Sequence, residues 1–500
     1  MCIRDSSQGE FDLIYKLNTT HNVILILHGS PYALRFFENV PTIIQAYEDD
    51  ELMQKAVVQA IMGASRISGK LPVSASSKFP AKAGLDRSGF FRLGYTFPEA
   101  VGISSDSLLA IDTIITEMIS KKAAPGCQVL AVKNGKIFYD KNFGYHTYAK
   151  KRAVRADDVY DVASVTKILA TNISLMKLYE ESKVNIYDPI KKYLPQLDTT
   201  NKGELIIEDI LAHQSGLPGW IPFYSDTMDK DSRKPKRQDD YYSNTQKDSF
   251  NINVINDLWI RDVWRDSIYN MIYNCDLREN RNYRYSDLGY YLFHQLIEAQ
   301  TNTKLDKYVE ENFYKPMGLK NTLFNPLKRI PMDRIPPTEK DEYFRLQTVK
   351  GYVHDMGAAM LGGVSGHAGL FSTSKDLASI MQMLLNGGTY QGKKYLKPKT
   401  IHKFTNRYYK STRRGLGFDM KELDPEKKLN VAEEVSYQAF GHLGFTGVSV
   451  YADPKYDLIY IFISNRTFPS MNNNVFSRKN YRPRVQSVFY KAMIDNRING

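Results

Sequence analysis

A serine and a lysine in the stretch 163–168 are the residues of this chain whose types and spacing most clearly suggest chemistry. The stretch reads Ala-Ser-Val-Thr-Lys-Ile, so Ser164 and Lys167 have the spacing S-x-x-K. On a helix, residues three apart lie on one face. A serine hydroxyl needs a nearby base to become a nucleophile, and a lysine can be that base when burial or nearby cations lower its pKa. Because a first helical turn also offers free N–H groups to a developing negative charge, the motif predicts nucleophile, base and part of an oxyanion hole.

The same spacing also has a purely structural interpretation. S-x-x-K arises by chance in many chains, and Ser164 could simply cap a helix that continues with a solvated lysine. The other segments of the chain decide between the two interpretations.

The elements around the motif predict a helix packed against an antiparallel sheet. A strand or turn at 158–162 precedes Ser164, and helical spacing of apolar residues runs on to about Glu181. Upstream, Asn134-Gly135 separates two apolar runs, which is a strong hairpin signal. A helix capped by Ser104 or Ser105 comes before this hairpin.

Three later segments carry further polar residues. Tyr285 lies before a helical pattern and is either a packing residue or a proton shuttle. His213 is either a base or a residue that fixes a turn. His354, Asp355 and His367 flank or lie in the glycine-dense stretch 362–373, but the spacing H-E-x-x-H is absent, so we predict no metal site.

Four motifs in one order carry a resemblance to a known superfamily. S-x-x-K at 164–167, Tyr-Ser-Asp at 285–287, Gly-His-Ala-Gly-Leu-Phe-Ser-Thr at 366–373 and His-Leu-Gly at 442–444 resemble the serine β-lactamases and penicillin-binding proteins, above all the class C-like and esterase-like members. The resemblance covers about residues 101–500. It implies a mixed α/β (α+β) fold, with an antiparallel sheet flanked by helices plus an all-helical subdomain.

The resemblance also implies roles for individual residues. Ser164 would be the nucleophile, Lys167 its base, and Tyr285 the relay of the proton to the leaving group. His442, Leu443 and Gly444 occupy the position of the family's K-T-G strand, and the N–H groups of Ser164 and Phe445 would form the oxyanion hole. The implied reaction is acyl transfer through a Ser164 acyl-enzyme on an ester, amide or peptidoglycan-type peptide.

Two departures from the family pattern affect the expected substrate. Asp287 stands where the pattern has asparagine, and an ionised carboxylate accepts hydrogen bonds but cannot donate them. His442 replaces the lysine that helps to bind a substrate carboxylate, and a histidine can be uncharged at neutral pH. Both departures argue against efficient β-lactam hydrolysis.

The first 95 residues predict a separate, partial α/β unit. Strands at 22–27 and 42–47 are followed by a helix at 50–62, and the motifs 28–32, 46–51 and 69–73 resemble the C-terminal part of the second domain of family 3 glycoside hydrolases. That family's catalytic aspartate lies in an N-terminal barrel for which this chain has no room. We therefore predict no glycosidase activity and structural roles for the polar residues here, which are His28, Glu48, Asp49 and Asp50.

Composition limits the possible classes of function. Over 500 residues, 42% are hydrophobic and 24% charged, as in soluble globular proteins of two or more domains. The three cysteines fit neither a disulfide framework nor a zinc site. The net charge of +12 comes from scattered residues with one cluster at 233–237, which we predict to be a solvated loop. The cluster lies inside a polar segment at about 222–255, which we predict to be a surface insertion over or beside the site. We expect a small-molecule or peptidoglycan-derived substrate, no nucleic acid, no cofactor, no metal and no transmembrane segment.

Localisation follows only from the two resemblances. Together they suggest a bacterial cell-envelope fusion of a β-N-acetylglucosaminidase (hexosaminidase) with a serine hydrolase, acting in the periplasm or at the envelope. Residues 1–6 contain no apolar signal-peptide region, and we interpret them as a scar at a truncated N-terminus. The alternatives are a catalytically silent penicillin-binding-like module that recognises peptidoglycan and a β-N-acetylhexosaminidase remnant.

Overall fold

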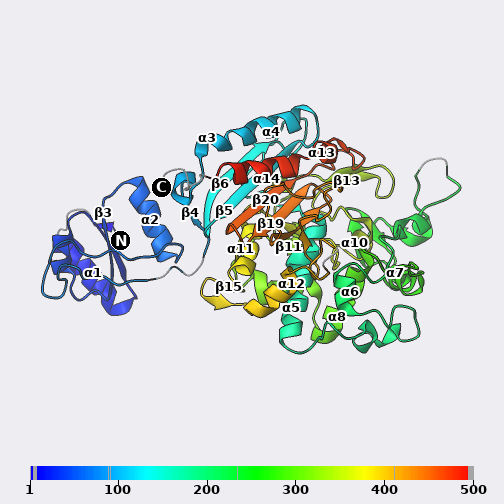
Figure 1. Cartoon of the computed structure of the whole chain (residues 1–500), viewed down its shortest axis with the longest axis horizontal. Coiled ribbons are helices and arrows are strands. Elements are labelled where there is room, and N and C mark those ends of the chain that lie inside the picture. The colour runs from blue at the N-terminus through cyan, green and yellow to red at the C-terminus, as the bar shows by residue number, and fades with distance from the viewer. Residues whose placement is uncertain are drawn as a thin grey trace. The chain divides into compact units, whose positions relative to one another are not determined.

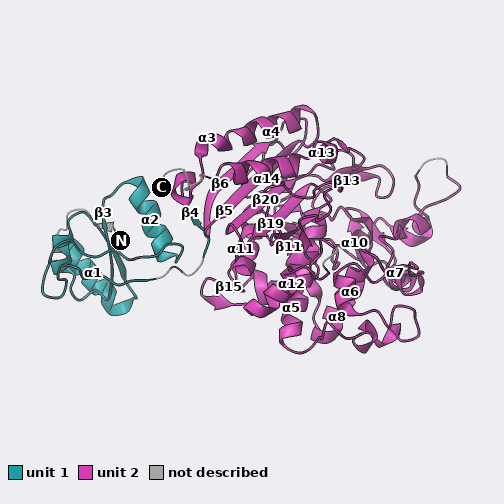
Figure 2. Ribbon diagram, in the orientation of Figure 1, with its two compact units in different colours: residues 1–94 teal, residues 95–500 magenta. Residues whose placement is uncertain are grey.

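The chain folds into two units in this computed structural model. Unit 1 comprises residues 1–94 and unit 2 residues 95–500 (Figure 2). The structure describes residues 2–3, 8–87, 89, 92–232, 235–409 and 412–493. Most of the predicted N-terminal scar, and Arg233 and Lys234 of the basic cluster, therefore lie outside the described residues.

Unit 1 is a small three-stranded parallel sheet with helices. β2 (Ile24–His28) pairs in parallel with β3 (Thr42–Tyr47), as the apolar runs in the sequence predict. It also pairs in parallel with β1 (Cys2–Ile3), a strand that was not predicted because these residues were interpreted as part of the scar. The helices of this unit are α1 (Gln8–Thr20) and α2 (Glu51–Ile61). The polar residues of the unit that the structure shows in contact serve local structure: Asp50 accepts the Met53 N–H at 2.7 Å and so caps α2, and His28 bonds the Glu48 carbonyl.

A seven-stranded sheet forms the core of unit 2 (Figure 1). Its central strands β19, β20 and β5 are buried throughout most of their length, because helices cover both faces. Successive side chains of a strand point to opposite faces. Tyr460 and Phe462 thus pack with α4 (Ala110–Ser120) and α14 (Tyr481–Lys491), while α11 (Ser374–Leu385) packs against the same strands as well. The strand order is β17 (Asp419–Met420), β18 (Phe440–Gly444), β19 (Val448–Asp453), β20 (Leu458–Ser464), β5 (Gly126–Lys133), β6 (Lys136–Gly144) and β4 (Gly94–Tyr95).

A mainly helical region extends from the sheet (Figure 1). It carries the S-x-x-K motif at 164–167 and the Tyr-Ser-Asp motif at 285–287. It also contains a small antiparallel sheet in the order β8 (Tyr242–Ser243), β10 (Leu258–Ile260), β9 (Ile252–Ile255). A second small sheet, β11 (Leu323–Phe324), β14 (Leu370–Ser372) and β7 (Tyr160–Asp161), leads into the Ser164 turn. The further helices of unit 2 are α3 (Ser105–Leu108), α5 (Ile173–Glu180), α6 (Ile207–Leu211), α7 (Val263–Asn274), α8 (Leu288–Thr301), α9 (Leu305–Val309), α10 (Met356–Met360), α12 (Pro398–Thr405) and α13 (Val475–Arg478).

Two sequence-based expectations need correction. The segment 222–255 is not only a surface insertion, because Phe223, Phe250 and most of β9 are buried and the segment supplies two strands. The apolar residues between Leu258 and Tyr273 have the spacing of one helix and predict it from the sequence, but 258–260 pair as β10 and α7 begins only at Val263. Cross-strand pairing at Trp259 overrides the helical spacing there.

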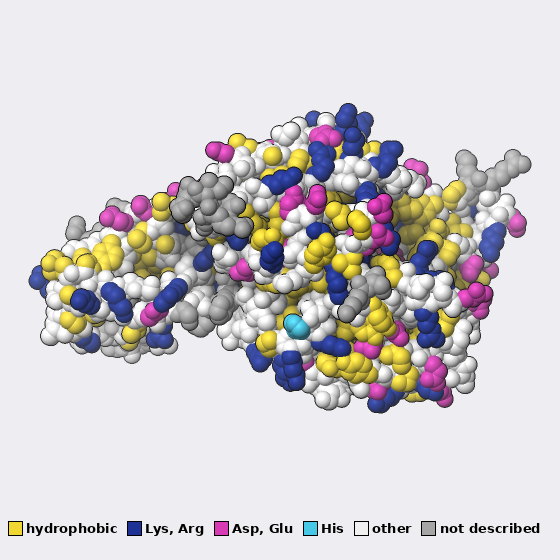
Figure 3. Space-filling model, viewed as in Figure 1, with side chains coloured by type: hydrophobic (Ala, Val, Ile, Leu, Met, Phe, Trp, Pro, Cys, Tyr) yellow, Lys and Arg dark blue, Asp and Glu magenta, His cyan; other side chains and the backbone are white. Residues whose placement is uncertain are grey.

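Two surface properties bear on possible partners. Within the residues that the structure describes, every helix falls short of the length and hydrophobicity that a bilayer-spanning segment needs. Lys and Arg side chains are spread among acidic and apolar ones over the face shown in Figure 3. The absence of a nucleic-acid partner stays a prediction.

The packing of α14 on the sheet should contribute strongly to stability. Phe489 is fully buried, with its ring 5.8 Å from those of Phe138 and Tyr460. Phe489→Ala should therefore lower the free energy of unfolding by about 3–5 kcal/mol, because it leaves a cavity in the core. Denaturant unfolding followed by near-UV circular dichroism measures this change. The exposed Leu109→Ala should stay within about 0.5 kcal/mol, and a loss below about 1 kcal/mol for Phe489→Ala would contradict this packing.

Candidate active site

Ser164 lies on a tight turn between β7 and a helix. The turn is one short 3₁₀ segment, Ala163–Val165, followed by a π-helical segment, Lys167–Asn172, before α5 begins. The predicted regular helix from Ser164 is thus irregular over its first residues. Ala163 has φ +48°, a left-handed conformation that costs an L-residue about 1–2 kcal/mol. Asp161 stabilises the turn by accepting the Ala163 N–H at 2.8 Å.

Lys167 is fully buried and its Nζ reaches three partners. It lies 3.0 Å from Ser164 Oγ, 3.0 Å from the carbonyl oxygen of His367 and 2.7 Å from Asp287 Oδ1. The rings of Tyr285 and Tyr290 lie 5.2 and 5.4 Å away, close enough for cation–π attraction. The pair Ser164–Lys167 is therefore not a helix cap with a solvated lysine.

Tyr285 completes the contacts of the serine hydroxyl. Its phenol donates to Ser164 Oγ at 2.9 Å. Burial, reinforced by the nearby Asp287 carboxylate, raises the pKa of Tyr285 well above its usual value. The phenol is therefore protonated at neutral pH and can donate a proton.

Asp287 directly precedes α8 and changes the electrostatics of the site. Its carboxylate is only partly exposed and forms an ion pair with Lys167. An asparagine at this position would carry no charge, so the ionic attraction to Lys167 Nζ depends on the carboxylate. The same Nζ that contacts Ser164 Oγ is therefore also held by Asp287.

His442 is a neutral residue on β18. Burial, together with the positive charges of Arg414 and Lys167, lowers the pKa of His442 to about 3. Its Nδ1 lies 2.7 Å from the Leu443 carbonyl, which can only accept, so Nδ1 carries the proton. Nε2 is then an acceptor, and it has no partner among the described residues. His442 therefore cannot replace the positive charge of a lysine.

Gly444 allows β18 to pass directly against the nucleophile turn. A Cβ at this position would lie 2.6 Å from the Val162 carbonyl oxygen. Thr446 adds a further link by donating to the Asp161 carbonyl at 2.8 Å. Phe445, which follows Gly444, thus lies beside the Ser164 turn, and its half-exposed ring lines the cleft. The role of its N–H in an oxyanion hole stays a prediction.

The cleft above Ser164 has a volume of about 660 Å³ and is strongly basic. Arg413, Arg414, Arg466 and Arg482 line it, with Asp419 as the one carboxylate among the described lining residues. No segment of the insertion 222–255 that the structure describes takes part in this lining. The four arginines were missed from sequence, because they come from separate loops and a helix start and carry no motif.

Arg414 is the arginine of the cleft that has a buried hydrogen-bond donor without a partner among the described residues. Its side chain is 3% exposed and lies 5.2 Å from the Tyr285 ring. Burial alone would lower the pKa of Arg414, but Asp419 raises it, so the guanidinium is charged. Nε donates to Tyr283 at 3.0 Å, whereas Nη1 has no partner among the described residues. A buried, charged donor without a partner next to the nucleophile is suited to a ligand anion.

The residues considered for a metal form hydrogen bonds with each other. His367 Nε2 lies 2.8 Å from Asp355 Oδ1, and its Nδ1 lies 2.9 Å from Ser365. His354 Nε2 lies 3.0 Å from Glu339. In the described part of the chain, no three His, Cys, Asp or Glu side chains are grouped to hold a metal ion. This network instead fixes the loop whose His367 carbonyl accepts from Lys167.

His213 serves the loop of Tyr285. Its Nδ1 accepts the Ser286 N–H at 3.2 Å, and its ring lies 4.7 Å from that of Tyr285. Burial and nearby cations lower the pKa of His213 well below its usual value. The residue is neutral and fixes the turn, which is the structural alternative considered from sequence.

Comparisons with known proteins agree with this fold. Residues 111–477 match the family model described as Beta-lactamase. A protein of Salmonella typhimurium (strain LT2), provisionally named D-alanyl-D-alanine carboxypeptidase, is 33% identical over 414 residues, covering 76% of this chain and 88% of the relative. D-amino acid amidase from Ochrobactrum anthropi SV3 is 16% identical with a TM-score of 0.53, covering 78% and 99% of the two chains. The class C β-lactamase from Rhodobacter sphaeroides is 14% identical with a TM-score of 0.52, covering 78% and 100%.

These matches confirm the predicted β-lactamase/transpeptidase-like fold, in which an antiparallel sheet is flanked by helices. The family model begins at residue 111, so the resemblance of residues 1–95 to family 3 glycoside hydrolases stays a prediction.

The ion pair between Lys167 and Asp287 should limit the reactivity of Ser164. In Asp287→Asn, Lys167 Nζ keeps its contacts with Ser164 Oγ and the His367 carbonyl but loses its contact with a carboxylate. The rate of phosphonylation of Ser164 at pH 7 should therefore rise by about tenfold. The surface variant Asp198→Asn is the matched control, since the one ion pair of its carboxylate within the described residues is with Lys191. An unchanged rate in Asp287→Asn would show that this pair does not control the lysine.

Proposed function

The chain belongs to the beta-lactamase family and is a serine hydrolase, and we propose that it cleaves an amide or ester bond beside a substrate carboxylate through a Ser164 acyl-enzyme. The preferred substrate in this proposal is a peptidoglycan-type peptide that ends in D-alanyl-D-alanine. The observation that carries it is the buried Arg414, which lines the cleft of Ser164 and whose Nη1 has no partner among the described residues. The provisional name of the Salmonella relative agrees with this substrate class.

The contacts of Ser164 support a complete acyl-transfer cycle. Neutral Lys167 accepts the Ser164 proton as Oγ attacks the substrate carbonyl, and the N–H groups of Ser164 and Phe445 stabilise the oxyanion. Tyr285, held protonated by its surroundings, donates its proton to the leaving nitrogen, and the C–N bond breaks. The phenolate regains a proton from Lys167. Water then attacks the acyl-enzyme by the reverse proton path and releases the acid.

In this proposal, Arg414 recognises the substrate carboxylate, a role for which the family pattern has a lysine at the position of His442. His442 is neutral at working pH and offers only an acceptor, Nε2, to the cleft. Arg414 is charged and buried, and a guanidinium binds a carboxylate through two parallel hydrogen bonds. The arginines of the cleft also attract anionic substrates over a longer range. β-Lactams, which also carry a carboxylate, would bind through the same contact.

Localisation is proposed from the substrate. Peptides ending in D-alanyl-D-alanine belong to the bacterial cell wall, so we place the enzyme in the periplasm or at the cell envelope. The glycosidase-like interpretation of residues 1–95 would fit the same compartment, and it is retained only as a proposal.

One observation favours a second candidate, a silent module that binds peptidoglycan peptides. The Lys167–Asp287 ion pair engages the amine that the hydrolase mechanism needs as its base. An activated ester distinguishes the candidates, because a silent module would bind it without forming an acyl-enzyme.

Release of D-alanine from a peptide ending in D-alanyl-D-alanine tests the proposal. The wild type should cleave the free carboxylate form and cleave its C-terminal amide about 10- to 100-fold less well, since the amide cannot pair with Arg414. Arg414→Gln should lose a similar factor in kcat/KM on the carboxylate peptide alone. Arg414→Lys keeps the positive charge but lacks the planar guanidinium with its two parallel donors, so it should recover part of the loss.

A neutral activated ester provides the control for folding and for the nucleophile. Its acylation rate should change little in Arg414→Gln. Equal cleavage of the carboxylate and amide peptides, or equal loss on all substrates, would contradict the assigned role of Arg414.

A further inference from the structure

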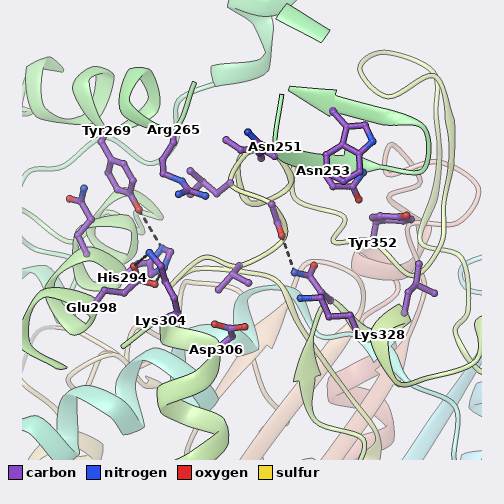
Figure 4. A pocket seen from close by; sticks show the side chains of 18 of the residues that line it. Asn251, Asn253, Arg265, Tyr269, His294, Glu298, Lys304, Asp306, Lys328 and Tyr352 are labelled. Atoms are coloured by element: carbon purple, nitrogen blue, oxygen red, sulfur yellow. Dashed lines mark hydrogen bonds and ion pairs between the residues drawn. The ribbon is translucent and has the colours of Figure 1, made fainter. Parts of the chain in front are cut away.

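A second pocket of about 620 Å³ lies between the insertion and helices α7–α9 (Figure 4). Its volume is within the roughly 300–1,000 Å³ of small-molecule sites. None of its described lining residues lines the cleft of Ser164. The pocket is therefore a separate site, and the proposed hydrolase mechanism does not use it.

Two flat aromatic side chains line this pocket. Trp259 on β10 and Tyr352 are both half-buried lining residues, and Figure 4 shows Tyr352 on the side away from Tyr269. Asn253 lies beside them, and its side-chain nitrogen bonds the Ile255 carbonyl at 2.9 Å. The nitrogen is thereby occupied, which leaves the amide oxygen as the group for a ligand.

A chain of hydrogen bonds forms the opposite side (Figure 4). Tyr269 contacts His294 at 3.3 Å, His294 contacts Glu298 at 3.0 Å, and Lys304 donates to Glu298 at 2.8 Å. Burial alone would raise the pKa of Glu298, but the hydrogen bonds from His294 and Lys304 lower it to about 2. This wall is thus polar, and Glu298 is ionised at neutral pH.

The charges of the pocket cancel. Three cationic and three anionic side chains line it, namely Arg265, Lys304, Lys328, Asp266, Glu298 and Asp306. The side chains of Arg265, Asp266 and Lys328 make no hydrogen bond or ion pair to any residue that the structure describes. The pocket therefore offers free donors and acceptors without a net charge, which disfavours phosphates and polyanions.

We propose that this pocket binds a neutral, β-1,4-linked oligosaccharide. Pyranose rings in such chains are flat, with C–H groups on their faces and hydroxyls at their edges. The faces would stack on Trp259 and Tyr352, and the hydroxyls would pair with the free charged and amide groups around them.

The pocket and the catalytic cleft share helix α8. Asp287 precedes this helix at the catalytic end, and Glu298 follows eleven residues later in the pocket. At 1.5 Å per residue, the two lie about 16 Å apart along the helix axis. The oligosaccharide site is thus within reach of a substrate that joins a glycan to a peptide, although binding itself does not depend on the proposed hydrolase function.

Titration calorimetry with two tetrasaccharides tests the inference, using the full chain. The probes are cellotetraose and the tetramer of β-1,4-linked N-acetylglucosamine. At least one should bind saturably, and Trp259→Ala should weaken it by about tenfold. Asp266→Ala, an exposed and unpaired position that should leave folding intact, should weaken binding as well. Trp220→Ala, an exposed tryptophan outside the pocket, should not.

The active-site variant Ser164→Ala separates this inference from the hydrolase proposal. It should retain full saccharide affinity whether or not the enzyme cleaves peptides. Absence of saturable binding of both probes would overturn the inference, as would binding that is unchanged in both Trp259→Ala and Asp266→Ala.

Discussion

The side-chain amine of Lys167 is completely buried, and much of the site is arranged around it. A polar group in a protein interior is unfavourable unless it is hydrogen-bonded or paired. Its three partners come from three distant segments: the Ser164 turn, the loop before α8 and the glycine-rich loop at His367. The nucleophile, the base and the proton donor Tyr285 are therefore assembled only when the sheet and the helical region are both folded.

This constraint explains features that have no chemical role of their own. The strained Ala163 is held by Asp161, which also accepts the His354 N–H. The His367–Asp355 pair orients the loop whose carbonyl reaches Lys167. Gly444 lets β18 approach the same turn without a clash. Each of these contacts restricts the conformations open to the turn that carries Ser164. The serine hydroxyl is thereby held in position for attack before substrate binds.

The electrostatics of the cleft differ from the pattern that the family resemblance implies. A neutral His442 on β18 and a charged, buried Arg414 on the loop before β17 place the positive charge of the cleft away from the strand position where the family pattern has a lysine. Asp287 adds a carboxylate next to Lys167. The family resemblance therefore predicts the nucleophile, while the proposed choice of substrate depends on groups outside the motif pattern.

Local patterns in the sequence predicted much of the framework and the centre of the site. The hairpin at Asn134-Gly135, the strands of unit 1 and the grouping of Ser164, Lys167 and Tyr285 depend on local spacing or on motif order. Arg414 and the second pocket could not be predicted, because they depend on burial and pairing between segments far apart in the chain. The irregular start of the Ser164 helix and the strand at Trp259 show tertiary contacts overriding local periodicity.

The central claim is that the partners of Lys167 make Ser164 an activated nucleophile. Intact mass spectrometry after exposure to a fluorophosphonate tests this claim directly. We expect one adduct per chain in the wild type and none in Ser164→Ala. A folded wild-type chain that takes up no label, or a label that persists in Ser164→Ala, would contradict it.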